Sequence, residues 1–330
     1  MEYMPEFSVL KPSTPKEASQ MLRDHQNARI LAGGTDLLVN IRRGIETPET
    51  LIDISSTEDM RDVLQNPDGS FTIGAGVTLA TLEKEKQLPT AIRNAAKKIA
   101  ATSHRNIATV GGNLCLDTRC VYYNQSEWWR KANDYCLKSC GDICHVAPKS
   151  KVCFAAFSGD LAPALMVFAA RVDIIGPDGI RTCALDDLYQ DDGADHLRLN
   201  NDEMIVSVTL LAPNNTDDMR SGYVKARVRN AIEFPLAGVA VALKKVDQRL
   251  ASLKIALTGV ATKPVALSGT EALLGRTVDE DFLNKLTHLL PKQIQPMTST
   301  FTPPGYRRKV ANNLMCDLVK RLFDGTYPKL

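Results

Sequence analysis

Six of the eight cysteines in this 330-residue chain lie between residues 115 and 153, in a polar segment without a regular hydrophobic period. The chain starts with acidic residues, Glu2 and Glu6, where a secretory signal would have a basic region followed by an apolar stretch. We therefore expect a cytoplasmic protein. Because disulfides do not persist in a reducing compartment, the clustered thiols are expected to bind a metal.

The cysteine spacing alone leaves the kind of metal open. Zinc sites usually bring their ligands as C-x2-4-C pairs, and only Cys136 with Cys140, or Cys140 with Cys144, meets that spacing. The wider spacings suit a loop wrapped around an iron-sulfur cluster. Iron-sulfur, zinc and unliganded thiols are therefore three alternatives at this point. Cys316 lies in a run with helical hydrophobic spacing and is expected to be a packed thiol.

The size and charge of the chain exclude several classes of protein. A length of 330 residues suggests two or three domains, and 44% hydrophobic with 24% charged residues is typical of a globular chain. A net charge of +2 is too small for a phosphate-tracking surface, so nucleic acid is not an expected partner. The longest apolar runs, 161–170 and 234–243, are about half as long as a membrane span, so none is expected.

The hydrophobic pattern predicts a chain of mixed strands and helices. Thr14 and Glu17 form a capping box that begins a helix ending at about residue 26. A polar stretch at 213–218 indicates a boundary before a smaller α+β part. The predicted strands are 7–10, 29–32, 51–54, 71–75, 106–110, 170–175, 180–183, 204–211, 223–228, 237–243 and 253–258, and further helices are predicted at 90–101 and from about 270, 279 and 306.

Two glycine pairs follow predicted strands: Gly33-Gly34 stands before Thr35-Asp36, and Gly111-Gly112 stands before Asn113. Without side chains, the backbone N–H groups of such turns approach a ligand closely and form a concavity that suits a pyrophosphate. Each pair alone is explained equally well by a tight turn. Two such loops, however, could hold one diphosphate from opposite sides.

A doubly wound dinucleotide-binding fold is the main competing prediction. Asp53 ends a strand about 20 residues after Gly34, where an acid that binds ribose would lie. Neither glycine pair belongs to a G-x-G-x-x-G fingerprint, so this fold is disfavoured.

The chain contains three motifs: LAGGTDLL from Leu31 to Leu38, RNIATVGGNL from Arg105 to Leu114, and GDLAP from Gly159 to Pro163. Together they resemble the FAD-binding subunits of the molybdenum hydroxylases, the family that includes xanthine dehydrogenase and carbon monoxide dehydrogenase. The resemblance continues through Lys225 and Tyr306-Arg307-Arg308 and covers essentially the whole chain.

The resemblance implies an α+β fold in two domains. Residues 1–216 would form a PCMH-type (VAO-like), two-lobed FAD-binding domain, and residues 217–330 a smaller C-terminal domain of the carbon monoxide dehydrogenase flavoprotein type. Asp160, Ile205 and Lys225 would contact the ribityl and isoalloxazine parts of FAD. The residues that would line the diphosphate are Leu31, Ala32, Gly33, Gly34, Thr35, Asp36, Leu37, Leu38, Thr109, Gly111, Gly112 and Asn113.

Two of these positions have an ordinary explanation beside the implied one. Lys225 near a flavin could stabilise negative charge on the reduced ring, whereas a lone lysine is by default a solvated surface residue. His104 departs from the family pattern just before the Arg-Asn pair, and its expected role is that of a hydrogen-bonded structural residue.

About 40 residues separate the second and third motifs, where most of the family has only a few. This insert, at about 115–155, resembles that of the 4-hydroxybenzoyl-CoA reductase β subunits through the runs DTRC at 117–120 and YNQSEWWR at 123–130. There the insert carries a 4Fe-4S cluster. Trp128 and Trp129 would supply apolar mass around it. The matching ligands are Cys120, Cys136, Cys144 and Cys153, although Cys115 or Cys140 could replace one of them on chemistry alone.

The resemblance implies an oxidoreductase subunit that transfers electrons and leaves substrate chemistry to a partner. The implied partners are a large subunit with molybdopterin cytosine dinucleotide and a small subunit with 2Fe-2S clusters, assembled as a dimer of heterotrimers. In the reductases of anaerobic aromatic degradation, ferredoxin supplies electrons through the 4Fe-4S cluster and FAD to molybdenum. There 4-hydroxybenzoyl-CoA loses its phenolic hydroxyl and becomes benzoyl-CoA.

Two other functions stay open from the sequence. One is the flavin subunit of another molybdenum hydroxylase, which oxidises an aldehyde or an N-heterocycle. The other is a non-catalytic nucleotide-binding scaffold whose loop is stapled by zinc. The sequence sets neither the potential of a cluster nor the direction of electron flow.

Overall fold

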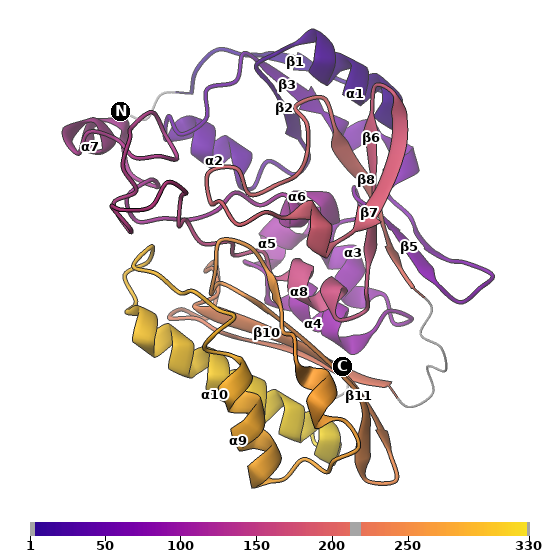
Figure 1. The fold of residues 1–330 in the computed structure, drawn as a ribbon. Helices are drawn as coiled ribbons and strands as arrows, with labels where there is room; N and C mark the ends of the chain where they lie inside the picture. The colour runs from indigo at the N-terminus through magenta and orange to yellow at the C-terminus, as the bar shows by residue number, and fades with distance from the viewer. Residues whose placement is uncertain (1–3, 212–218, 329–330) are drawn as a thin grey trace.

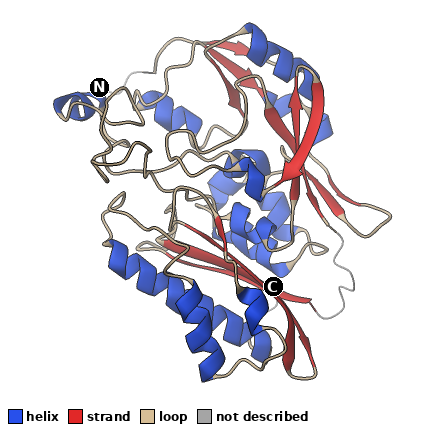
Figure 2. Cartoon of the chain, viewed as in Figure 1, coloured by secondary structure: helices blue, strands red, loops and turns tan. Residues whose placement is uncertain are grey.

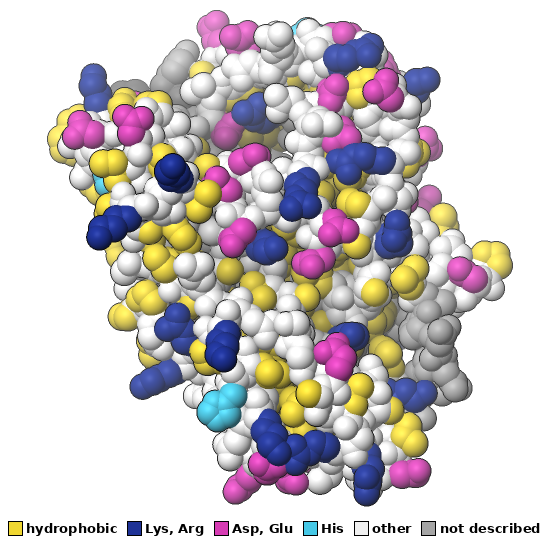
Figure 3. Space-filling model, viewed as in Figure 1, with side chains coloured by type: hydrophobic (Ala, Val, Ile, Leu, Met, Phe, Trp, Pro, Cys, Tyr) yellow, Lys and Arg dark blue, Asp and Glu magenta, His cyan; other side chains and the backbone are white. Residues whose placement is uncertain are grey.

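The computed structural model describes residues 4–211 and 219–328, and most of the N-terminal part lies above the C-terminal part in Figure 1. The predicted polar boundary at 213–218, with the expected domain limit at residue 216, lies outside the described residues. Within the described ranges, no helix has the length and hydropathy needed to cross a membrane. Basic and acidic side chains are mixed over the face seen in Figure 3, in keeping with the small net charge.

The chain begins with a small parallel sheet in the order β1-β3-β2, whose strands are connected by two helices. Thr14 Oγ1 accepts the N–H of Glu17 at 3.2 Å and begins the first helix, as the capping box predicts. The carboxylate of Glu17 accepts the N–H of Ser13, one residue before the expected partner. The elements are β1 (Ser8–Leu10), α1 (Pro15–Asp24), β2 (Ala28–Leu31), α2 (Leu37–Arg42) and β3 (Thr50–Asp53).

A second, antiparallel sheet has the order β4-β5-β8-β6-β7. β6 and β7 form the predicted hairpin, in which Gly176 pairs with Gly179. β8 pairs with both β5 and β6, so segments before and after the cysteine-rich insert share one sheet. The strands are β4 (Val63–Gln65), β5 (Phe71–Gly74), β6 (Arg171–Gly176), β7 (Gly179–Ala184) and β8 (Met204–Leu210).

Along the chain, six short helices follow β5 and precede β6. Most of them pack beneath the two sheets in the view of Figures 1 and 2. They are α3 (Leu79–Lys84), α4 (Thr90–Lys98), α5 (Thr102–Arg105), α6 (Val110–Leu114), α7 (Glu127–Ala132) and α8 (Leu161–Met166), and single 3-10 turns occur at Ile54–Ser56, Glu58–Met60 and Asp186–Leu188.

The C-terminal part is an antiparallel sheet in the order β12-β11-β10-β9, covered on one face by α9 and α10 (Figure 1). The helical starts predicted near 270, 279 and 306 agree with a 3-10 turn and these two helices. The elements are β9 (Met219–Ala226), β10 (Ala237–Val246), β11 (Arg249–Thr258), β12 (Val265–Ala266), a turn at Thr270–Leu273, α9 (Glu280–Leu289) and α10 (Pro304–Asp324).

The alternation of side chains along β10 explains how the two parts pack together. Val239 and Val241 belong to the core under α9 and α10. Ala240 and Ala242 point to the opposite face and belong to the core of the N-terminal part. Small side chains on this second face let α4 and α8 approach the sheet closely, so β10 is buried on both sides.

The predicted strand at 106–110 is wrong. The chain leaves α5 at Arg105, and Thr109 then caps α6, its Oγ1 accepting the N–H of Gly112 at 3.1 Å. Thr109 makes only an isolated bridge to Thr78. A threonine that can cap a helix outweighs the short apolar pattern of Ile107 and Val110, which by itself does not distinguish a strand from a helix.

Candidate functional site

The first glycine loop, residues 31–38, connects the end of β2 to the start of α2. Gly34 has φ of +66°, which glycine adopts at little cost. A Cβ on Gly33 would lie 2.1 Å from the carbonyl oxygen of Ile107, so this position accepts no side chain. The close approach brings the first glycine loop against the segment that leads into the second glycine loop, residues 109–113.

The first glycine loop keeps its backbone donors open. In the described part of the chain, the backbone N–H groups of Gly33, Gly34, Thr35 and Asp36 donate to no protein acceptor. All eight residues from 31 to 38 are half-buried, so the loop lines a partly open surface. Unpaired N–H groups in a row, one of them next to a left-handed glycine, can bind an anion such as a diphosphate.

The second glycine loop is built differently, and the expectation that both pairs end strands is corrected here. Gly111 and Gly112 form the first turn of α6, and their N–H groups already donate to Ala75 O at 2.8 Å and to Thr109 Oγ1 at 3.1 Å. Gly112 is exposed, and an added Cβ there would meet only Thr109 Oγ1, at 3.2 Å. This loop therefore offers a backbone surface without side chains, which a ligand could approach, and its glycine N–H groups are already used.

Asn113 joins the second glycine loop to the third motif across the insert. Its side-chain oxygen accepts the N–H of Leu161 at 3.0 Å, at the start of α8. A Cβ on Gly159 would lie 2.7 Å from the carbonyl oxygen of Asn113. The motifs at 109–113 and 159–163 are thus in direct contact, although about 40 residues separate them in sequence.

Asp160, Tyr223 and Lys225 form a buried polar group beside these loops. Lys225 Nζ lies 3.1 Å from Asp160 Oδ2, and the two side chains are 1% and 4% exposed. The Tyr223 hydroxyl donates to Asp160 Oδ1 at 2.5 Å, and Lys225 also donates to Glu233 O at 3.3 Å. The default expectation that Lys225 is a solvated surface residue is therefore wrong. Ile205 is buried in the main core on β8.

The charges of this group influence each other. Burial raises the pKa of Asp160, and the Lys225 ammonium and the Tyr223 hydroxyl oppose that effect. Nearby Lys98, at the end of α4, has a lowered pKa because it is partly buried and because Arg227 and Lys225 repel its charge. Lys98, Lys225 and Arg227 thus lie close enough to Asp160 for their charges to influence it or one another.

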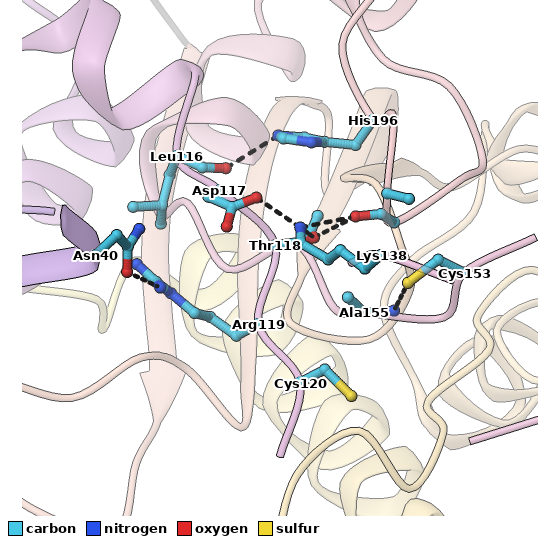
Figure 4. A network of polar contacts seen from close by, with 12 residues as sticks. Asn40, Leu116, Asp117, Thr118, Arg119, Cys120, Lys138, Cys153, Ala155 and His196 are labelled. Atoms are coloured by element: carbon cyan, nitrogen blue, oxygen red, sulfur yellow. Dashed lines mark hydrogen bonds and ion pairs between the residues drawn. The ribbon is translucent and has the colours of Figure 1, made fainter. Parts of the chain in front are cut away.

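The insert brings four cysteines together around one small cavity, the cysteine pocket. Each of the four is buried, and Figure 4 shows Cys120 and Cys153 on neighbouring segments of this region. Burial raises the pKa of Cys120 to about 11 and that of Cys153 to about 12, so both are neutral thiols without a metal. The pocket is lined by Cys120, Tyr122, Tyr123, Cys136, Leu137, Lys138, Cys144, His145, Val146 and Cys153.

The other two cysteines of the cluster lie outside the pocket. Cys140 is exposed, and Cys115 packs against the main core, where burial raises its pKa to about 12. Cys316 is half-buried beside α9, with its Sγ 3.5 Å from Thr287 Oγ1, in agreement with a packed thiol. The structure thus separates the four matched cysteines from the remaining ones.

A buried lysine that the sequence did not single out fixes the insert to the FAD-binding part. Lys138 Nζ donates to Asp117 Oδ1 at 2.6 Å, to Gly193 O at 2.9 Å and to Thr118 Oγ1, as Figure 4 shows in part. Its side chain is 4% exposed. Lysine is ordinarily a surface residue, so only the tertiary structure could reveal this role.

The two tryptophans of the insert behave differently from each other. Trp129 is half-buried, and its ring centroid lies 6.3 Å from that of Tyr122, which lines the pocket. Trp128 is 77% exposed, so the expectation that it packs around the metal is wrong. Both lie on α7, where neighbouring residues point to different faces of the helix. His104 is half-buried on α5, with Nδ1 3.4 Å from Ser103 Oγ, which fits a structural residue.

The cysteine pocket does not have the geometry of a single-ion site. Across residues 4–211 and 219–328, no group of three or more His, Cys, Asp or Glu side chains is arranged to hold a metal ion. Four buried cysteines nevertheless line one cavity. The four residues therefore share one cavity without forming a ready-made site for one metal ion.

Two protein-family models match this chain, one in each part. Residues 5–212 match the FAD binding domain in molybdopterin dehydrogenase, and residues 222–322 match the CO dehydrogenase flavoprotein C-terminal domain. The first match alone covers more than half of the chain.

Alignments with curated relatives cover most of this chain and most of each relative. The aldehyde oxidoreductase FAD-binding subunit PaoB of Escherichia coli is 32% identical over 286 residues, which is 83% of this chain and 87% of that protein. The carbon monoxide dehydrogenase medium chain of Afipia carboxidovorans is 26% identical, and 96% of each chain is covered.

Solved structures show the same fold. A chain of the Cu,Mo-CO dehydrogenase superposes with a TM-score of 0.79 at 22% identity, with 98% of this chain and 99% of that chain covered. A chain of quinoline 2-oxidoreductase from Pseudomonas putida 86 gives a TM-score of 0.77 at 18% identity, with 99% and 100% covered. The two-domain α+β fold expected from the sequence is therefore confirmed.

Proposed function

Since this chain belongs to the family of FAD-binding subunits of the molybdenum hydroxylases, we propose that it carries a 4Fe-4S cluster beside its FAD and relays electrons to or from a molybdenum subunit. It is an oxidoreductase subunit and a flavoprotein. The observation that carries the proposal is the pairing of an open N–H loop with a pocket of four buried cysteines in one domain.

The first glycine loop fits the diphosphate of FAD. Four of its N–H groups have no partner among the described residues, so they supply donors without the cost of breaking internal hydrogen bonds. The exposed Gly112 leaves room for the same group on the opposite side. We assign residues 31–38 and Thr109, Gly111, Gly112 and Asn113 to this part of the site, with Asn113 acting through its contact to Leu161.

Asp160 and Lys225 fit the flavin end of the site as a preformed charge pair. Among the described residues, only Asp160 and Glu233 O accept from Lys225 Nζ, which leaves one of its three donors for a ligand. A flavin takes up two electrons and releases them singly, and a fixed ammonium nearby favours its negatively charged reduced form. The buried Ile205 would support this end by packing.

The donor set of the cysteine pocket fits a 4Fe-4S cluster. Four cysteine thiolates are the usual ligands of a cubane, and Cys120, Cys136, Cys144 and Cys153 line one cavity. The thiol pKa values raised by burial mean that cluster binding would displace protons. Tyr123 and Lys138 would shield the cluster from water.

The zinc-stapled scaffold is less well supported. A structural zinc ion needs four ligands that converge at about 2.3 Å from one point. Among the described residues, no group of three or more ligands is arranged in this way. The family match to an FAD-binding domain also argues against a scaffold without a redox cofactor.

The partners follow from the family. Relatives are named as FAD-binding subunits or medium chains, which are components of larger enzymes. We propose a large molybdenum subunit with molybdopterin cytosine dinucleotide and a small subunit with 2Fe-2S clusters, in a dimer of heterotrimers. A ferredoxin is the proposed electron donor if the enzyme runs reductively.

Two substrates are candidates. The insert motifs favour reduction of 4-hydroxybenzoyl-CoA to benzoyl-CoA. The 32% identity to an aldehyde oxidoreductase subunit favours oxidation of an aldehyde. The similarity to a nicotine 6-hydroxylase medium subunit keeps an N-heterocycle as a further oxidative substrate.

One experiment separates these functions. The purified complex is analysed for iron and flavin and then assayed with reduced ferredoxin and 4-hydroxybenzoyl-CoA, and with aromatic aldehydes and an artificial acceptor. Benzoyl-CoA formation supports the reductive assignment, and aldehyde-dependent acceptor reduction alone supports the oxidative one. Zinc in place of iron, without flavin absorbance, would contradict both.

A further inference from the structure

Arg119 is the side chain that connects the two candidate cofactor sites. It stands directly before Cys120, and its guanidinium forms an ion pair with Asp36 of the first glycine loop. Its Nη1 also donates to Asn40 Oδ1 at 3.2 Å, as Figure 4 shows, and Asn40 donates to the other Asp36 oxygen at 3.3 Å. A single residue thus lies between the loop proposed for FAD and a cysteine of the pocket.

The backbone of Arg119 also closes the insert. Its N–H donates to Ala156 O and its carbonyl oxygen accepts from Ala156 N, both at 2.8 Å. All four pocket cysteines lie between these two residues. The position of Arg119 therefore fixes both the stem of the insert and the Cys120 end of the pocket.

The ion pair removes a charge that would oppose a diphosphate. Asp36 occupies the N-cap position of α2, yet its carboxylate makes no cap hydrogen bond and turns to Arg119 instead. An unpaired carboxylate beside open N–H groups would repel an anion. The guanidinium of an arginine is charged at neutral pH, so it offsets the charge of this carboxylate.

Two further contacts hold the guanidinium in place. Its centre lies 4.9 Å from the ring centroid of Phe234, which belongs to the segment that precedes β10. Asn40 is itself buried. Arg119 Nε is buried and has no partner among the described residues, which leaves a donor facing this junction.

We propose that Arg119 makes FAD binding and cluster retention depend on each other. This inference rests on the proposed FAD and 4Fe-4S sites. Loss of the cluster frees Cys120 and loosens Arg119, which then neutralises Asp36 less well, and loss of FAD acts in the reverse direction. Such coupling is reciprocal, and about tenfold in affinity is a typical size. Arg119 is thereby a positioning residue that holds both sites.

The test is a double-mutant cycle on FAD affinity. The dissociation constant of FAD is measured by titrating flavin-depleted full-length chains: wild type, Cys120→Ser, Arg119→Met and the double variant. Cys120→Ser is expected to weaken FAD binding about tenfold in the wild-type background and less than about twofold in the Arg119→Met background. Arg119→Lys, which keeps the charge, should retain part of the coupling.

Controls separate coupling from misfolding and from failure of the proposed sites. Arg181→Met removes another arginine-carboxylate pair, with Glu203, remote from both loops, and should leave FAD affinity and iron content unchanged. Thermal unfolding reports whether each variant is folded. Iron in the wild type together with equal effects of Cys120→Ser in both backgrounds would overturn the coupling alone. A wild-type chain that never binds iron would overturn the coupling and the proposed cluster together.

Discussion

The ammonium of Lys225 lies 3.1 Å from the carboxylate of Asp160, and both side chains are almost completely buried. Removing one partner leaves a buried charge without compensation. We expect Lys225→Met to lower the free energy of unfolding by about 3–5 kcal/mol. The double variant Lys225→Met with Asp160→Asn should recover most of that loss. Urea unfolding of the flavin-free chain measures both, and a double variant as unstable as the single one would refute the argument.

Gly33 accepts no side chain because the Cβ of an alanine would lie 2.1 Å from the carbonyl oxygen of Ile107. Gly33→Ala should therefore destabilise the chain by about 1–3 kcal/mol, since overpacking forces the backbone to move. Gly305→Ala is the matched control, because no atom lies within 4 Å of the added Cβ. Equal melting temperatures for the two variants would show that Gly33 is not packed against the Ile107 carbonyl.

Gly112→Val tests the second glycine loop. Among the described residues, a Cβ added at this exposed position meets only Thr109 Oγ1, at 3.2 Å, so the larger side chain should reach into the open side where the diphosphate is proposed to bind. FAD content after purification should fall to near zero, while the far-ultraviolet circular dichroism stays unchanged. Full flavin occupancy in this variant would exclude Gly112 from the site.

The cysteine pocket predicts opposite results for two neighbouring cysteines. Cys144→Ala removes a buried lining residue and should abolish the iron content, whereas Cys140→Ala changes an exposed thiol and should leave the iron content unchanged. Iron and sulfide analysis with the visible spectrum measures both. With FAD in excess, Cys144→Ala should still bind flavin stoichiometrically. Equal iron loss in the two variants would mean that the pocket is not the cluster site.

His196 predicts a pH dependence of stability. Burial, with a contribution from Lys138, lowers its pKa to about 4, although Asp117, the Leu116 carbonyl and Asp195 oppose the shift. Between about pH 6.5 and 4 the unfolded chain binds a proton that the folded chain does not, so stability falls as the pH falls through this window. The full effect is at most about 3 kcal/mol.

The comparison with a variant isolates this histidine from other acid-sensitive groups. His196→Gln should remove part of the slope of unfolding free energy against pH between 4 and 6.5. His25→Gln, at an exposed position, should leave the slope as in the wild type. An unchanged slope in both variants would show that His196 titrates alike in the folded and unfolded chain.

Much of the secondary structure could be predicted because local signals agree with the tertiary structure. Thr14 and Pro15 begin α1, and the turn at Pro177-Asp178 closes the hairpin of β6 and β7. The segment at 106–110 failed for a physical reason: a threonine cap and a short apolar strand look alike over four or five residues.

The candidate site could be predicted only in part. The four pocket cysteines were identified by resemblance, whereas spacing alone left zinc and free thiols as alternatives. Arg119 and Lys138 were not identified, because their roles depend on contacts with Asp36 and Gly193, far away in sequence. Long-range burial of a charged side chain leaves no periodic trace in the sequence.

The pair of hydrogen bonds between Arg119 and Ala156 has a consequence for how such a chain can be altered. The ends of the 120–155 segment, called the excursion below, are joined by the single bridge between Arg119 and Ala156. This bridge closes a long loop, so it offsets part of the conformational entropy that loop closure costs. Cutting the excursion out and joining its ends by a tight turn would also remove the contact of Lys138 with Gly193. A flavin protein without iron should remain, with a lower affinity for FAD than the intact chain, because the cluster end of the Arg119 coupling is gone.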